Sequence, residues 1–116
     1  MPDRDLNRAE LQDARLGSSV LARADLRGAN LAKADLSYAN LESANLSGAS
    51  LQNASLKGAV LRAANLSMSD LHEANLGYAD LLGANLNGAN LAGARFGKAI
   101  WTDGRICSAG SVGECR

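Results

Sequence analysis

The sequence predicts an all-β solenoid, in which the chain winds in repeated coils around a narrow apolar interior. Two observations predict this fold class. Leucine occupies every fifth position without a break from Leu6 to Leu91, and Phe96 takes the next place in the series. Alanine stands two residues before nearly all of these positions, and the exceptions are Arg4, Ser19 and Ser69.

A period of five suits neither a straight helix nor a straight strand. In an α-helix, successive leucines would lie about 140° apart and the apolar row would spiral around every side. In a strand, odd spacing sends successive leucines to opposite faces. Alanine and leucine two residues apart point the same way on a short extended stretch, and a bend before the next alanine returns the chain to the same interior. The expected core includes Leu26, Leu46, Leu66, Leu86 and Phe96.

The remaining three positions of each pentad have the composition of turns. The residue before each leucine is mostly Asp, Asn or Ser, and the two that follow are often small or polar, as in Arg27-Gly28 and Asn87-Gly88. Such residues tolerate turn conformations and can bond their own backbone. Each pentad is therefore expected to form one short strand and one bend.

Pentads such as Ala24-Asp25-Leu26-Arg27-Gly28 and Ala84-Asn85-Leu86-Asn87-Gly88 resemble the pentapeptide-repeat family, and the resemblance runs from about Arg4 to Asp103. It implies a right-handed quadrilateral β-helix of about five coils, each with four pentads. The sequence itself gives faint support for four sides, since Val20, Val60 and Ile100 replace the usual Asp or Asn at multiples of 20. Three-sided coils also remain compatible with the spacing.

Within a single domain, we expect residues 1–103 to form the β-helix and residues 104–116 to form a C-terminal capping tail. Five apolar residues near this end are interpreted as a cap over the last coil: Phe96, Ile100, Trp101, Ile106 and Val112. The alternative is an adhesive end, as in some members of the family. The oligomeric state is therefore expected to be a monomer or an end-to-end dimer.

The only two cysteines, Cys107 and Cys115, lie in a Gly- and Ser-rich tail. This pattern favours one disulfide closing a short loop, with two free thiols in a cytosolic protein as the alternative. The tail also resembles those of bacterial pentapeptide-repeat proteins that look exported, which implies an oxidising compartment. We expect no signal peptide within residues 1–116. An exported protein with its leader removed and a cytoplasmic protein both remain open.

The composition excludes several function classes. Twelve basic and twelve acidic residues give a net charge of zero, which argues against general nucleic-acid binding. No apolar run approaches the length of a membrane-spanning helix. The single histidine, His72, lies beside Asp70 and Glu73, but no convergent set of ligands or oriented nucleophile accompanies it. We expect no catalytic residue, no metal site and no cofactor.

Tyr38 and Tyr78 share an outward column under four-sided winding, with Gly58 between them. Together with Trp101 they form the surface that we expect a partner to contact. The absence of a catalytic set and the regular surface favour a non-enzymatic binding or scaffold protein, and we expect its partner to be another protein. The alternative, implied by the resemblance, is a DNA mimic that binds DNA gyrase. The neutral net charge and the lack of a dimerisation helix disfavour it.

Overall fold

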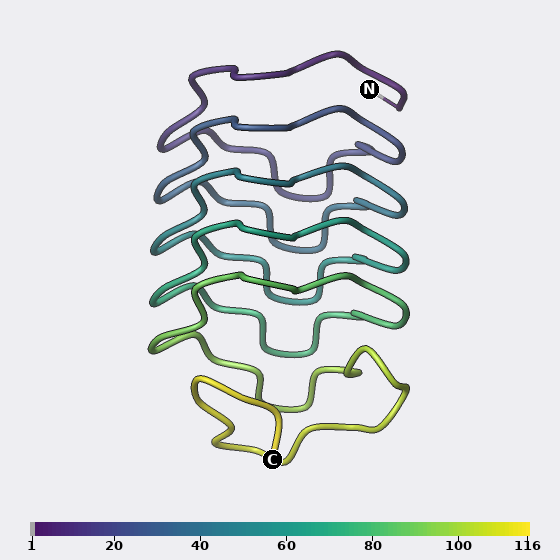
Figure 1. Ribbon diagram of the computed structural model, residues 1–116, viewed down its shortest axis with the longest axis vertical. Coiled ribbons are helices and arrows are strands. Elements are labelled where there is room, and N and C mark those ends of the chain that lie inside the picture. The colour runs from purple at the N-terminus through teal and green to yellow at the C-terminus, as the bar shows by residue number, and fades with distance from the viewer. Residues whose placement is uncertain (1) are drawn as a thin grey trace.

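The computed structural model describes residues 2–116 as a stack of similar coils (Figure 1). Parallel backbone bridges join residues that are 20 apart, from Asp5–Asp25 to Asp80–Ile100. Each coil therefore contains four pentads, and no parallel bridge in residues 2–116 joins residues 15 apart. The four-sided winding is confirmed. The stack measures 34 × 24 × 21 Å.

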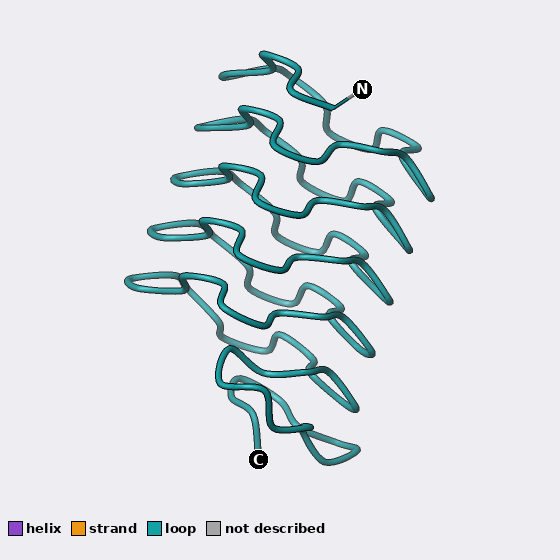
Figure 2. Cartoon of the chain, turned by 90° about the vertical axis from the view of Figure 1, so that its right-hand side faces the viewer, coloured by secondary structure: helices purple, strands orange, loops and turns teal. Residues whose placement is uncertain are grey.

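We number the sides by their central residues. Side 1 carries Leu6 and every twentieth residue after it, side 2 begins at Leu11, side 3 at Leu16 and side 4 at Leu21. The coils run from residue 4 to 23, 24 to 43, 44 to 63, 64 to 83 and 84 to 103. Each side contributes one bridged residue per coil, so residues 2–116 contain neither an α-helix nor a strand of several residues (Figure 2). Residues 2–116 accordingly include no helix long and apolar enough to cross a membrane.

The corners are tight turns that begin at the leucines. The N–H of Ala49 donates to the carbonyl of Leu46 at 3.0 Å, and equivalent bonds recur around the coils. The second residue after each leucine has positive φ, as in Lys33 (62°) and Gly48 (68°). Positive φ at this position is the mark of a type II turn, and it explains the frequent glycine.

The Asp or Asn before each leucine completes the hydrogen bonding of its turn. In the middle coils the backbone ladder leaves one N–H per pentad without a backbone acceptor, that of the residue after leucine. In many pentads the preceding side chain accepts it, as when Asn45 Oδ1 accepts from the Ser47 N–H at 3.1 Å. Asp25 and Asn65 do the same for Arg27 and Ser67. This local bond gives a physical reason for the Asp/Asn preference.

Leucine and alanine fill the interior. Leu26, Leu46, Leu66 and Phe96 are fully buried. Leu86 is only partly buried, because it belongs to the last coil. The parallel ladder ends there, and no further segment of residues 2–116 pairs with the outer edge of sides 1 and 2 of this coil. The first coil is similarly less enclosed than the middle of the stack.

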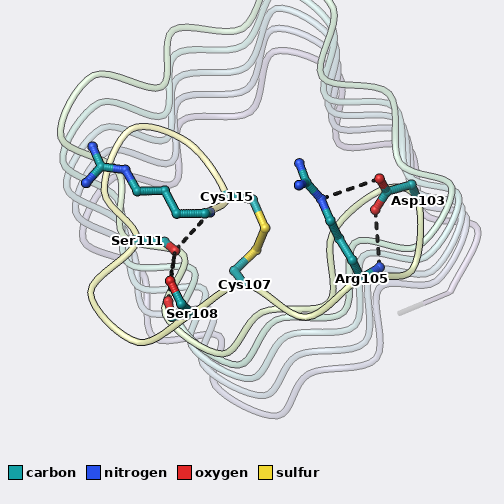
Figure 3. Close-up of a disulfide and its surroundings, with 7 residues drawn as sticks. Asp103, Arg105, Cys107, Ser108, Ser111 and Cys115 are labelled. Carbon is teal, nitrogen blue, oxygen red and sulfur yellow. Dashed lines mark hydrogen bonds and ion pairs between the residues drawn. A yellow bond between two sulfur atoms is a disulfide. The ribbon is translucent and has the colours of Figure 1, made fainter.

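The tail folds back under sides 3 and 4 of the last coil. Antiparallel bridges join Ile100 to Ile106 and Arg95 to Val112. Cys107 and Cys115 form a disulfide with an S–S distance of 2.07 Å, and both cysteines are buried (Figure 3). The predicted disulfide is therefore present, and it lies across the open end of the coil in the figure.

Two residues of the expected cap face outward instead. Ile106 is 69% exposed and Val112 is 43% exposed. Directly paired residues share a face of the sheet, and their partners Ile100 and Arg95 occupy outward positions. The expectation that Ile106 and Val112 cover the core is therefore wrong. The buried groups of the tail are the two cysteines and Ser111.

Candidate partner-binding surface

The two tyrosines lie at the corner between sides 3 and 4. Tyr38 is 59% exposed and Tyr78 is 63% exposed, and they are two coils apart. The Tyr38 ring packs over Gly58 and fills the space where a β-carbon of residue 58 would lie. The column between the tyrosines is therefore not an open slot, and each tyrosine presents its ring to solvent separately.

Trp101 occupies a different environment from the tyrosines. It takes the inward position on side 4 of the last coil and is partly buried against the core. Its ring meets Phe96 edge to face, with 5.0 Å between the ring centroids. Trp101 therefore contributes to the end of the core, although part of it remains accessible.

Other exposed apolar side chains extend the tyrosine corner onto side 4. Val20 is 48% exposed, Leu82 is 36% exposed, and Ile106 lies in the tail below them. By contrast, Met68 lies at the diagonally opposite corner, between sides 1 and 2. Exposed apolar surface is thus concentrated around one corner and the adjoining side, as is common in protein-binding surfaces.

Side 3 carries most of the isolated positive charge of the stack. Its pentads contain four cations, which are Arg15, Lys57, Arg95 and Lys98, all exposed. No hydrogen bond or ion pair from their side chains occurs within residues 2–116. Asp35 is the one carboxylate on this side, and hydrogen bonds from the Ser37 hydroxyl and N–H lower its pKa.

Side 2 has the opposite balance. Its pentads contain four carboxylates and a single lysine, and these residues are Glu10, Asp13, Asp70, Glu73 and Lys33. The zero net charge of the chain therefore conceals two neighbouring sides of opposite sign. Because interactions between exposed charges are screened within about 8–10 Å at physiological salt, a partner would sense each side separately.

His72 forms a local pair with Asp70 on side 2. The distance from His72 Nδ1 to Asp70 Oδ1 is 2.7 Å, and Asn90 Nδ2 donates to the same oxygen at 3.3 Å. Burial would raise the pKa of Asp70, but the hydrogen bonds and charge of His72, together with Asn90, outweigh it and lower this pKa. Within residues 2–116 no group of three or more His, Cys, Asp or Glu side chains is arranged to hold a metal ion.

The cations of side 3 were not singled out from the sequence. They are separated by 42, 38 and 3 positions along the chain, so no local cluster marks them. Writing the sequence in rows of 20 residues brings all four to the same pentads, although only Arg15 and Arg95 share one column. The four-sided winding that placed the two tyrosines in one column would also have brought these cations to one side, so the signal was the charge summed over each side.

A family model described as pentapeptide repeats matches residues 9–48, 39–77 and 69–100. Among solved structures, a pentapeptide repeat protein of the cyanobacterium Cyanothece is 30% identical, with a TM-score of 0.63; the alignment covers 87% of this chain and 83% of that one. A pentapeptide repeat protein of the Arabidopsis thaliana thylakoid lumen is 27% identical, with a TM-score of 0.51, and the coverage is 97% and 80%. These similarities confirm the right-handed quadrilateral β-helix. A search of curated proteins gave no match.

Proposed function

The chain belongs to the pentapeptide-repeat family, and from that premise we propose that it is a non-enzymatic binding module whose partner is a protein. The observation that supports this function best is the gathering of exposed apolar side chains at the tyrosine corner and side 4. Tyr38 and Tyr78 offer large ring surfaces and hydroxyl groups on a rigid ladder. Tyrosine is enriched at protein interfaces because its ring contributes contact area at little entropic cost.

The backbone supports the same interpretation. Tyr38 N donates to the Lys57 carbonyl at 2.8 Å, and Tyr78 N donates to the Gly97 carbonyl at 3.0 Å. Both tyrosines are thus fixed to the next coil through the main chain. A preorganised surface of this kind loses little conformational freedom when a partner binds.

Affinity capture from the native host with matched variants tests this function. The bait is the wild-type chain, the double variant Tyr38→Ser/Tyr78→Ser, or the control Met68→Ser, which removes an exposed apolar side chain at the opposite corner. We expect one protein to be retained by the wild type and by Met68→Ser and to be lost with the double variant. Retention of the same proteins by all three baits would contradict the assignment to the tyrosine corner.

A gyrase-binding DNA mimic is the second candidate, and the acidic balance of side 2 is the observation that favours it. The carboxylates lie in two separate groups, Glu10 with Asp13 in the first coil and Asp70 with Glu73 in the fourth. Each DNA strand carries a charge about every 3.4 Å, which this broken pattern does not reproduce. A supercoiling assay with purified gyrase distinguishes the candidates, and we expect no inhibition by the added chain.

A further inference from the structure

We propose that side 3 binds an extended, acidic polypeptide segment of the protein partner, laid along the axis of the stack. This inference rests on the proposed binding function and specifies the chemistry of its partner. It starts from the order of side chains down side 3. Arg15 lies in the first coil, Tyr38 in the second, Lys57 in the third, Tyr78 in the fourth and Arg95 in the fifth, so cations and tyrosines alternate.

The bridges fix the positions of these residues along the axis. Arg15, Asp35, Ser55, Asn75 and Arg95 form one continuous bridged column. Adjacent coils are about 4.8 Å apart, so the column spans about 19 Å. Along the axis Arg15, Lys57 and Arg95 recur roughly every 10 Å, with Lys57 two residues to one side of the column. An extended segment in the polyproline II conformation rises about 3.1 Å per residue with three residues per turn, so side chains three residues apart lie on one face and are separated by about 9 Å, close to the same spacing.

The cations on this side are available to a ligand. Arg23, Arg27 and Arg62, on the other sides, form ion pairs with Asp3, Asp25 and Asp80. The cations of side 3 have no such partner in residues 2–116. The tyrosine hydroxyls likewise make no hydrogen bond within these residues.

Side 3 is also flat enough for a backbone to approach. The position directly after the central Leu or Phe of each side 3 pentad holds Gly17, Ser37, Lys57, Gly77 and Gly97. Three of the five coils therefore have no side chain at this position. An acidic segment could therefore lie against the column, with carboxylates meeting the cations and accepting hydrogen bonds from the tyrosine hydroxyls.

Two other anionic occupants fit less well. A nucleic-acid strand carries its phosphates more densely than one cation per 10 Å, and the carboxylates of side 2 would repel its neighbouring segments. The acidic side of a second copy has its carboxylates in the first and fourth coils, about 14 Å apart along the axis, which does not match cations in the first, third and fifth coils.

The test uses a labelled peptide with glutamate at every third position and proline between, which favours the polyproline II conformation, titrated with the full chain at about 50 mM salt, where the Debye length exceeds 10 Å. The double variant Lys57→Gln/Lys98→Gln should bind roughly three- to tenfold more weakly than the wild type, as expected for the loss of two exposed charge pairs. The control Arg8→Gln/Lys33→Gln loses the same charge from sides 1 and 2 and should bind like the wild type.

Three results would overturn the proposal. These are absence of saturable peptide binding, equal weakening in both double variants, and tighter binding of an oligothymidylate with the same number of charges. These three results can be told apart from a failure of the proposed binding function, because that function is tested separately by the tyrosine-dependent capture of a host protein. If that capture persists while the peptide fails to bind side 3, the partner has another chemistry and the binding module stands.

Discussion

The ring of Tyr38 covers Gly58, which lies one coil further along in the same column. The same relation joins Met68 to Gly88 and Glu73 to Gly93. Side chains at this corner position therefore lean towards the C-terminal neighbour. A glycine there serves two purposes, since it accommodates positive φ and leaves room for the side chain from the preceding coil.

Gly58→Ala should separate these two purposes. Gly48 provides a matched control, because its φ of 68° is close to the 67° of Gly58 and no atom would contact its added β-carbon within 4 Å. Both substitutions should cost about 1 kcal/mol for the left-handed backbone. Gly58→Ala should cost about 0.5–1.5 kcal/mol more, because it forces the Tyr38 ring from its rotamer. Denaturant unfolding measures both costs, and the excess should vanish in a Tyr38→Ala background.

Leu46→Ala should destabilise the stack by about 2–5 kcal/mol, since it empties a fully enclosed position in the middle coil. Leu86→Ala should cost less, because Leu86 is only partly buried at the open end. Equilibrium unfolding in urea compares the two variants. Equal losses would argue that the last coil is enclosed in solution, for example by another chain.

Removal of the His72 side chain should leave fold and partner binding unchanged. On side 2 the ring contacts Asp70 at its exposed surface and completes no wider group of ligands in residues 2–116. Circular dichroism and the capture assay check the His72→Ala variant. A metal ion bound by the wild type with micromolar or better affinity, and lost in this variant, would refute the prediction.

Asp70→Asn should flatten the acid limb of the stability profile. The pKa of Asp70 is lower in the folded chain than its ordinary value of 3.8, so its stabilising contribution is present above that value and is lost as pH falls through the folded pKa. The amide oxygen can still accept the N–H of His72, so the turn is retained. Thermal unfolding from pH 5 down to about pH 2 compares the variant with the wild type. Parallel profiles would show that Asp70 does not contribute.

The Cys107–Cys115 disulfide should stabilise the tail rather than the whole stack. In the chain-entropy model such a short loop contributes roughly 2–3 kcal/mol. Reduction should increase hydrogen exchange in residues 104–116 and around Phe96 first, with the middle coils unaffected. Thiol titration of unfolded, unreduced protein supplies the direct check. Two free thiols per chain would disprove the bond.

The winding of the chain could be predicted from sequence because the regularly spaced Leu and Ala residues are the ones that fill the interior. The number of sides needed the family resemblance, since five-residue spacing is the same for three- and four-sided coils. The direction of Ile106 and Val112 depended on an antiparallel pairing that no pattern in the tail encodes. The cations of side 3 stayed hidden because they are far apart in sequence and occupy three different columns of their side, so no single repeat position marks them.

Because the turns repeat every five residues and the columns every 20, the length of a natural insertion or deletion decides what it changes. Loss of one pentad between Lys57 and Tyr78 would keep the interior intact yet rotate every later residue by a quarter turn. Tyr78 would then leave the column of Tyr38, and Lys57 and Arg95 would no longer share a side. Loss of a whole coil would keep these residues in their columns and would only shorten the distance between them along the axis. Descendants of this chain can thus change their surface pattern in one step without any change to the fold.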